Sequence, residues 1–287
     1  MKNYIERINQ IYSELQIQTA TPNDIGQNND VLVINDSLIF RFPKYQNGIE
    51  RLAEEKEILN RVRKFVSLPT PKFKYQSFDE PEVGKVFVGY EIIEGVPFWK
   101  ESFYEIKDAK LKREIAEQLT TFLKELHSIP KIELVEIGLK EHHPIEVMAE
   151  MHKKIQEKLF SFMRADAKEE ITLSFKDFLE NNREIETALI HGDFGSSNIL
   201  WDPTLKEITG VIDFGGSGLG DPAYDLAGIL SSFGEDFYRL CLSLYPNGEE
   251  ISERVKFYRS TFALQEALHG IEHNDEEAFE AGIKNYR

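Results

Sequence analysis

The stretch Ala188–Gly215, ALIHGDFGSSNILWDPTLKEITGVIDFG, contains three short apolar runs with polar residues at their ends. The spacing of the short apolar runs ALI, NILW and ITGVIDF predicts three short strands that carry polar residues at their ends. Asp193 follows the first run, and Asn198 comes after four intervening residues. Asp213 stands at the end of the third run, about 20 residues further on. Two carboxylates and one amide are therefore expected at the ends of neighbouring strands.

This order of residues fits the transfer of a phosphoryl group to an alcohol. In such sites one carboxylate accepts or orients the proton of the hydroxyl group, and Asp193 is the candidate for this catalytic role. An amide oxygen and a second carboxylate hold Mg²⁺ on a triphosphate, because magnesium takes hard oxygen ligands. Asn198 and Asp213 are the candidate metal ligands. Each triplet alone, HGD or DFG, is also an ordinary turn signal, so the prediction depends on their order and spacing.

Residues 1–95 predict a small antiparallel sheet with an inserted helix. An opening helix has one apolar face, formed by Ile5, Ile8, Tyr12 and Leu15. Strands are expected in four runs: VLVI (31–34), SLIFRF (37–42), KFKYQSF (72–78) and KVFVGYEII (85–93). The first two runs flank a tight turn at Asn35 and Asp36, which predicts a β-hairpin. The inserted helix is expected from about Gly48 to Phe65.

The segment EGVPF (Glu94–Phe98) marks a change in composition and is interpreted as a hinge. Helices are predicted around the apolar stripe from Leu111 to Leu126, over 144–163, over 168–181, and from Asp221 onward. We therefore expect two domains: residues 1–95, and a mostly helical second domain over 96–287.

The segments HGDFGSSNIL, GVIDFGGSGLGDPAYDLA and LIFRFPK resemble the aminoglycoside phosphotransferase family, in particular its 2″-phosphotransferase branch. The resemblance covers nearly the whole chain. It implies an α/β (α+β) protein-kinase-like fold, with a small antiparallel-sheet N-lobe that clamps a nucleotide and a larger, mostly helical C-lobe. The implied reaction moves the γ-phosphoryl group of Mg-ATP or Mg-GTP to an aminoglycoside hydroxyl, 2″ by analogy, which confers antibiotic resistance in the cytoplasm.

Residue by residue, the resemblance makes Asp193 the catalytic base and Asn198 and Asp213 the ligands of Mg²⁺. His191 takes the first position of the catalytic loop and is interpreted as a packed, hydrogen-bonded scaffold residue. In the segment GDPAYDLA, Asp221 is expected to cap the following helix and Asp225 to brace the catalytic loop. The glycine-rich run GSGLG (216–220) is interpreted as a flexible activation segment.

Nucleotide binding needs a strand cation that neutralises the phosphates and a helix glutamate that holds it. The family places a lysine on this strand, whereas the aligned residue is Arg41; Lys44 is a supporting candidate and Glu55 the expected partner. Strand alternation puts Arg41 on the face opposite Phe40 and Phe42. The other cofactor-binding candidates are Asn28 in the turn GQNND (Gly26–Asp30), and Tyr90, Glu91, Ile92 and Ile93, which resemble the purine-binding hinge.

The chain carries 50 acidic and 34 basic residues, a formal charge of −16, which disfavours binding to nucleic acid or to an anionic membrane. One cysteine excludes an internal disulfide, and no run of 18 apolar residues is present. From Phe214 onward 13 acids stand against 6 bases, which suits a polycationic aminoglycoside as the substrate. The protein is expected to be a monomer. The predicted substrate contacts, besides Asp193, are Glu235, Asp236 and Glu266.

Two other functions stay open. One is a kinase of a small metabolite such as choline, homoserine or methylthioribose, or of a macrolide sugar. The other is an inert module that binds nucleotide or drug without turnover. His269 and His273 stand at a spacing that zinc can use, but no third ligand is evident, so metal binding there is not expected.

Overall fold

A computed structural model describes residues 2–23, 28–182 and 184–287. The chain divides into two compact units, each assembled from separate segments. Unit 1 consists of Met1–Phe98, Ile132–Leu139 and Ser197–Ser217. Unit 2 consists of Trp99–Lys131, Lys140–Ser196 and Gly218–Arg287. The domain boundary that the sequence places at residue 95 stays a prediction.

Unit 1 is built on a five-stranded antiparallel sheet in the order β1-β2-β3-β5-β4. The strands are β1 (Ala20–Asn23), β2 (Asn29–Ile34), β3 (Leu38–Pro43), β4 (Tyr75–Ser77) and β5 (Phe87–Glu91). The predicted hairpin is present, with Asn35 and Asp36 both in the left-handed region (φ 52° and 50°), as a two-residue hairpin turn requires. The inserted helix is α2 (Gln46–Val62), so the predicted sheet with one helix is confirmed. Strand β1 was not predicted, because the sequence ATPN lacks an apolar alternation.

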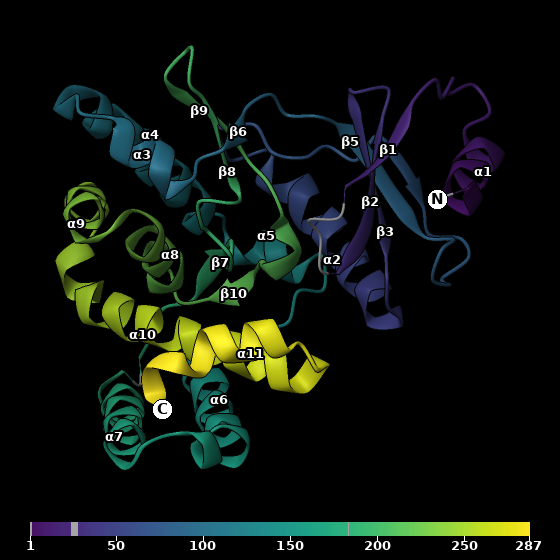
Figure 1. Ribbon diagram of the computed structural model, residues 1–287. Coiled ribbons are helices and arrows are strands. Elements are labelled where there is room, and N and C mark those ends of the chain that lie inside the picture. Colours follow the sequence, from purple (N-terminus) through teal and green to yellow (C-terminus); the bar gives the residue numbers. More distant parts are fainter. Residues whose placement is uncertain (1, 24–27, 183) are drawn as a thin grey trace. The chain divides into compact units, whose positions relative to one another are not determined.

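The two faces of this sheet have different neighbours. Phe40 and Phe42 are fully buried and pack with Ile8 of α1 (Lys2–Ile11). On the other face Val88 packs with Leu52 of α2, and both helices are visible beside the sheet in Figure 1. Because side chains alternate along a strand, β3 presents Arg41 on the face covered by α2.

A second sheet of unit 1 brings together residues that are far apart in sequence. It contains β6 (Val96–Pro97), β8 (Ile199–Asp202) and β9 (Glu207–Val211), in the order β6-β8-β9. The segment interpreted as a hinge therefore contributes a strand. Ile199 pairs with Val211, and the Ile212 N–H donates to the Asn198 carbonyl (2.9 Å). The start of β8 and the end of β9 thus lie at the same end of a hairpin. Unit 1 also contains most of helix α5 (Lys131–Val135) and the 3₁₀ turn η2 (Phe214–Gly216).

Unit 2 is mostly helical, as predicted. Its helices are α3 (Lys100–Glu105), α4 (Ala109–His127), α6 (Pro144–Lys158), α7 (Ala165–Asn181), α8 (Ala223–Phe233), α9 (Glu235–Leu244), α10 (Gly248–His273) and α11 (Glu276–Ile283), with 3₁₀ turns η1 (Phe160–Phe162) and η3 (Lys284–Tyr286). In the part of the chain with assigned positions, no helix has both the length and the hydrophobicity to cross a bilayer.

Unit 2 also contains a short antiparallel pair, β7 (Ala188–Ile190) with β10 (Gly218–Gly220). The GSGLG run was expected to be flexible, and the structure corrects this: its last three residues form β10. The physical reason is close packing at Gly220, where an added Cβ would stand 2.6 Å from the Cδ1 of Ile190. Glycine lets the two backbones approach closely enough to pair.

The interior of unit 2 contains one histidine whose protonation should matter for stability. His152 of α6 stacks on Phe175 of α7 (ring centroids 4.7 Å apart), and its Nε2 is buried with no hydrogen-bond partner among the atoms whose positions are described. Burial lowers the pKa of His152 below the ordinary value for histidine. The unfolded chain therefore takes up a proton at a higher pH than the folded chain does.

We expect the free energy of unfolding to fall as the pH drops below about 6.5, and to level off below the lowered pKa of folded His152. One proton limits this slope to about 1.4 kcal/mol per pH unit, and partial exposure makes it smaller. Phenylalanine can keep the ring stacking without a titratable group. Urea unfolding of the wild type and His152→Phe between pH 7.5 and 5 tests this: equal slopes for the two proteins would contradict it.

Candidate active site

Unit 1 holds a buried ion pair at the centre of its sheet. Arg41 of β3 lies between β2 and β5 and is only 8% exposed. Its Nη1 donates to the Oε1 of Glu55 at 2.7 Å, and Glu55 on α2 is 2% exposed. The predicted pairing of these two residues is present, while Glu54 is exposed. Loss of either partner would leave a buried, uncompensated charge, so the pair is held as a unit.

The guanidinium of Arg41 reaches two further groups. Its Nη2 lies 3.8 Å from the Oδ1 of Asp213, and buried Tyr90 is its diagonal neighbour across the paired strands β3 and β5. Burial opposes the charged form of Arg41, but Glu55, Tyr90 and Asp213 outweigh it and raise the pKa of Arg41. Arg41 therefore stays positively charged, which a phosphate-binding group must be.

Asp213 and Asn198 offer the oxygen atoms that a magnesium ion takes. Asp213 has a left-handed backbone (φ 64°) at the start of η2, where its side chain accepts a hydrogen bond from Gly215 N–H (3.4 Å). The side chain of Asp213 is 53% exposed, and Asn198 is buried just before β8. The β8–β9 hairpin is what brings the two segments to one end of the sheet. A carboxylate and an amide oxygen fit the hard-ligand preference of Mg²⁺.

Two predicted nucleotide contacts lie near the start of β2. The Nζ of Lys44 is 3.9 Å from the Oδ1 of Asp30, and the Lys44 N–H donates to the carbonyl of Asn28 at 3.0 Å. Lys44 thus stands beside Asp30 in a surface cleft shared with α1. Gly26 and Gln27 of the predicted GQNND turn lie outside the described residues.

The predicted hinge begins within β5. The Tyr90 side chain is buried, whereas Glu91 is exposed and pairs with Lys74. The N–H of Ile92 already donates to the carbonyl of Ser37 (2.9 Å), so this amide is engaged within the sheet edge. The backbone of Tyr90, Glu91, Ile92 and Ile93 as a purine-binding hinge stays a prediction.

In unit 2, Asp193 follows β7 in a loop whose backbone is tightly held. Gly192 has a positive φ (77°), and buried His191 accepts a hydrogen bond on Nδ1 from Asp193 N–H (3.2 Å). Asp225 of α8 accepts from His191 N–H at 2.7 Å and from Gly192 N–H at 2.9 Å. The predicted roles of His191 as scaffold and Asp225 as brace are confirmed. Asp193 itself is exposed, as a group that meets a substrate must be.

Two residues behind this brace were missed by the sequence analysis. His127 of α4 contacts Asp225 Oδ2 through Nε2 (3.0 Å) and the Tyr245 hydroxyl through Nδ1 (2.8 Å). The carboxylate of Asp225 only accepts, so Nε2 of His127 carries the proton in this contact. Burial also raises the pKa of Tyr245. Because the three residues come from separate helices and a helix end, no local pattern in the sequence links them.

Asp221 was expected to cap the helix that follows it. Its Oδ1 accepts from Ala223 N–H (3.0 Å), the first residue of α8. The same carboxylate accepts hydrogen bonds from Nε and Nη2 of Arg254, at 2.7 and 3.2 Å. Asp221 is therefore a buried structural residue, as the sequence indicated.

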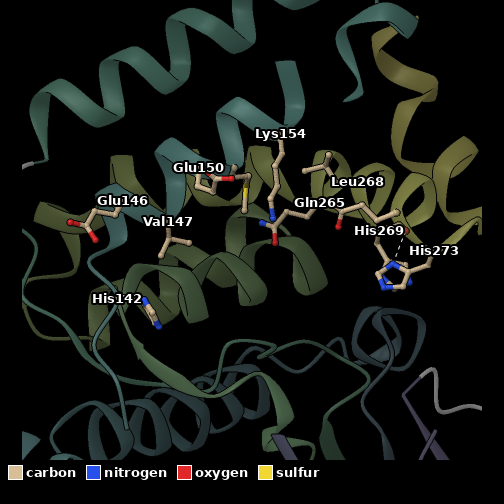
Figure 2. A pocket seen from close by; sticks show the side chains of 11 residues that line it. His142, Glu146, Val147, Glu150, Lys154, Gln265, Leu268, His269 and His273 are labelled. Carbon is tan, nitrogen blue, oxygen red and sulfur yellow. Dashed lines mark hydrogen bonds between the residues drawn. The ribbon is translucent and has the colours of Figure 1, made fainter. Parts of the chain in front are cut away.

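Unit 2 also contains a pocket of about 480 Å³ between α6 and α10 (Figure 2). Its lining residue Gln265 accepts a hydrogen bond on Oε1 from the hydroxyl of Tyr224 (3.0 Å), which precedes the brace residue Asp225 on α8. Burial raises the pKa of Tyr224, and the nearby charges of Asp193 and Asp225 add to this rise. The charged and imidazole groups of the pocket are Glu146, Glu150, Glu272, Lys154, His142, His269 and His273.

The acids that the sequence analysis proposed as substrate contacts lie elsewhere on unit 2. Glu235 and Asp236 are exposed at the start of α9, where Glu235 pairs with Arg239 (2.8 Å). Glu266 is exposed and does not line the pocket, although its neighbour Gln265 does. Glu146 and Glu150 were not singled out because α6 reads as an ordinary amphipathic helix, and Glu272 of α10 was counted only among the 13 acids after Phe214.

His269 and His273 stack in this pocket, with ring centroids 4.3 Å apart. Within the ranges that the structure covers, no three His, Cys, Asp or Glu side chains are grouped as metal ligands. The Nδ1 of His273 instead contacts the backbone carbonyl of His269 (3.0 Å).

Comparison with known proteins identifies the family. The family model of the phosphotransferase enzyme family (APH) matches residues 19–275, and the chain belongs to this family. Viomycin phosphotransferase of Streptomyces vinaceus is 34% identical over 180 residues. That match covers 60% of this chain and 61% of the viomycin enzyme, so the chain spans less than two thirds of that relative's length.

Solved structures share the fold. The GDP and kanamycin complex of APH(2″)-IIIa superimposes with a TM-score of 0.92 at 23% identity, covering 100% of this chain and 97% of that one. The ADP-bound structure of APH(2″)-Ib superimposes with a TM-score of 0.79 at 22% sequence identity, and the match covers 98% of this chain and 96% of that one. The structure of macrolide 2′-phosphotransferase type I has a TM-score of 0.76 at 18% sequence identity, and the match covers 98% of this chain and 96% of that one. The protein-kinase-like α+β fold expected from the sequence is confirmed.

Proposed function

We propose that the chain transfers the γ-phosphoryl group of a magnesium-bound nucleoside triphosphate, ATP or GTP, to a hydroxyl group of a cationic antibiotic. The observation that carries this proposal is the buried Arg41–Glu55 pair with Asp213 beside it. A charged guanidinium held between a helix glutamate and an exposed aspartate is an arrangement that suits a triphosphate and its metal ion. Family membership supports the same reaction class.

In the proposed reaction each unit contributes different groups. Arg41 neutralises phosphate charge, and Asn198 and Asp213 would hold Mg²⁺, which when bound offsets the negative charge of the triphosphate. Asp193 orients the acceptor hydroxyl and takes its proton as the new oxygen–phosphorus bond forms. The bond from the γ-phosphorus to the bridging oxygen breaks, and the nucleoside diphosphate leaves. Catalysis rests on positioning and charge neutralisation.

The substrate we propose is an aminoglycoside or a similarly cationic antibiotic, with the 2″ hydroxyl as the acceptor by analogy. The α6/α10 pocket supports a cationic ligand, because Glu146 and Glu150 outnumber Lys154, while the third carboxylate, Glu272, is already paired with Lys158. Lys158 donates a hydrogen bond to Glu272 (2.6 Å) and holds the pKa of that carboxyl below its ordinary value, so Glu272 stays ionised. The Tyr224–Gln265 contact joins this pocket to α8, whose next residue, Asp225, holds the loop that carries Asp193.

An assay of nucleotide consumption tests the reaction class and the acceptor together. ATP and GTP are each offered with kanamycin, gentamicin, viomycin, a macrolide, choline or homoserine. Product formation with a cationic antibiotic, seen by mass as one added phosphoryl group, supports the proposal. Turnover only with choline or homoserine would move the chain to the metabolite kinases. Nucleotide binding without turnover on any acceptor would favour the inert module.

Charge substitutions in the pocket should change antibiotic affinity in opposite directions. Glu150→Gln removes an attractive charge, so the KM for a cationic antibiotic should rise, by up to about fivefold. Lys154→Gln removes a repulsive charge, so the same KM should fall. Steady-state kinetics at low and high salt measures both, since screening weakens both effects.

The matched control is Glu169→Gln, which neutralises an exposed glutamate of α7 that does not line the pocket. It should leave the KM unchanged. The nucleotide KM should stay constant in all three variants. Equal shifts in Glu150→Gln and Glu169→Gln, or a rise in KM for Lys154→Gln, would refute the pocket as the antibiotic site.

A further inference from the structure

A polar stripe on α10 forms one wall of the α6/α10 pocket. Its residues follow one another at intervals of four, which places them on one face of the helix: Thr261, Gln265, His269 and His273. The last three line the pocket, as Figure 2 shows, whereas Thr261 is fully buried. Gln265 is half-buried and thus stands, along this stripe, between a core residue and the histidines of the pocket.

The two ends of the Gln265 amide have different partners. Its Nε2 donates to the Oγ1 of Thr261 at 2.9 Å, and its Oε1 accepts from the hydroxyl of Tyr224 at 3.0 Å. The hydroxyl hydrogen of Thr261 is already donated to the carbonyl of Tyr258 (2.7 Å), so toward Gln265 this hydroxyl can only accept. The nitrogen of the amide therefore faces Thr261, and its oxygen faces Tyr224.

Tyr224, the partner on α8, is itself held against α10. Its ring lies edge-on to Tyr258 with the centroids 5.3 Å apart, and 5.4 Å from the ring centroid of Phe262. The residue after it, Asp225, accepts the two backbone N–H groups that brace the catalytic loop. The orientation of Gln265 is therefore set by the same helix that holds this loop.

The Gln265 amide has hydrogen-bonding capacity left over. A primary amide has two N–H donors and an oxygen with two acceptor sites. Toward the residues that the structure describes, Gln265 uses one of each, so one N–H and one acceptor site can serve a ligand in the pocket. A hydroxyl group both donates and accepts and can use either. An ammonium group only donates, and the carboxylates of Glu146 and Glu150 serve it better.

We propose that Gln265 recognises a hydroxyl group of the bound antibiotic, and that Tyr224 is a positioning residue that keeps the amide in the required orientation. The ligand class is a polyhydroxylated cation such as an aminosugar, as opposed to a bare polyamine. Glu146 and Glu150 attract both kinds of cation, whereas a fixed amide discriminates, because a ligand without a hydroxyl group leaves its N–H unpaired. This inference rests on the antibiotic role proposed above for the α6/α10 pocket.

The test compares two cations on the full chain without nucleotide, by calorimetry. Kanamycin carries hydroxyl and ammonium groups, whereas spermine is a linear polycation without a hydroxyl group. Gln265→Met keeps the length of the side chain and removes the amide. It should weaken kanamycin binding about two- to tenfold, as the loss of one hydrogen bond would, and spermine binding less than about twofold. Glu150→Gln, in contrast, should weaken both, because it removes charge.

Tyr224→Phe tests the positioning role, because it keeps the ring on α10 and removes only the hydroxyl. It should weaken kanamycin binding about two- to fivefold in the wild-type background and have little further effect in the Gln265→Met background. In steady-state kinetics it should raise the kanamycin KM and leave kcat and the nucleotide KM unchanged. A fall in kcat with an unchanged kanamycin KM would show a disturbed catalytic loop instead, and would overturn the positioning role.

Two variants serve as matched controls. Gln156→Met changes an exposed glutamine of α6 that does not line the pocket. Tyr286→Phe removes a hydroxyl that meets the Ser260 carbonyl of α10 (3.4 Å), also outside the pocket lining. Both should bind kanamycin and spermine as the wild type does. If Gln265→Met does not fold, Tyr224→Phe alone decides, by a loss for kanamycin that exceeds the loss for spermine.

The outcomes separate this inference from the antibiotic assignment of the pocket. Equal losses for kanamycin and spermine in Gln265→Met would overturn the recognition of a hydroxyl group. Equal effects of Tyr224→Phe in both backgrounds would reject its action through Gln265. If Glu150→Gln weakens kanamycin binding and Gln265→Met does not, the pocket assignment stands and this inference fails. If neither changes it, or the wild type does not bind kanamycin, both fail together.

Discussion

Asp193→Ala is expected to abolish phosphoryl transfer, with a loss of at least about a thousandfold in kcat, while nucleotide affinity stays close to that of the wild type. The loop around this residue is held by Asp225 through the amides of His191 and Gly192, so removal of an exposed carboxylate leaves the backbone in place. The activity would be lost because no carboxylate takes the proton and because the hydroxyl group of the antibiotic is no longer oriented toward the phosphate.

Single-turnover kinetics together with calorimetric nucleotide binding measures both parts of this expectation. Asp193→Asn is the conservative variant, because it keeps the shape of the side chain but replaces one acceptor oxygen by a donor and removes the charge, so it should be nearly as inactive. Glu253→Ala removes a highly exposed acid of α10 and serves as the control with normal activity. An Asp193→Ala protein that turns over within tenfold of the wild type would remove Asp193 from the catalytic role.

Asp213→Asn should cause the second largest loss, on the order of a hundredfold in kcat, with a higher magnesium concentration needed for half-maximal activity. The variant removes the negative charge that we assign to metal binding and that lies 3.8 Å from Nη2 of Arg41. Asparagine tolerates the left-handed backbone that Asp213 adopts (φ 64°), so the turn should survive the substitution.

A magnesium titration of the initial rate, with thermal unfolding of the same samples, separates metal binding from stability. Asp202→Asn is the matched control, because Asp202 also ends a strand of this sheet and caps the turn between β8 and β9. Its magnesium dependence should equal that of the wild type. If Asp213→Asn titrates with the same magnesium midpoint as the wild type, Asp213 is not a metal ligand.

The sequence predicted contacts best where a charged residue interrupts the apolar face of a strand or a helix. Arg41 in an apolar strand and Glu55 on the apolar side of a helix each need a charged partner, and the two pair as predicted. Asn198 and Asp213 were predicted to act together from the order and spacing of these polar residues, and the β8–β9 hairpin of the structure brings their segments to one end. The Arg41–Glu55 contact is consistent with the side-chain period of two residues in a strand and 3.6 residues in a helix, and with the free-energy cost of burying an unpaired charge.

Other features could not be predicted, because they depend on packing between distant segments. The polar strand β1 pairs only because β2 presents an edge, and β6 pairs only with residues of β8. The His127–Asp225–Tyr245 network joins positions far apart in the chain. The pocket between α6 and α10 likewise requires the relative placement of two helices, which their separate hydrophobic patterns do not specify.

Because unit 1 is assembled from three separate chain segments, it cannot finish folding until the last of them has been synthesised on the ribosome. Strand β6 at Val96–Pro97 obtains its partner only when β8 at Ile199–Asp202 has been synthesised. At about 5–20 residues per second, the roughly one hundred intervening residues take about 5 to 20 seconds to translate. During that interval the nascent N-terminal sheet has no Asn198 or Asp213, and much of unit 2 emerges first. A nascent chain stalled before residue 197 should therefore retain chaperones and resist capture on immobilised nucleotide.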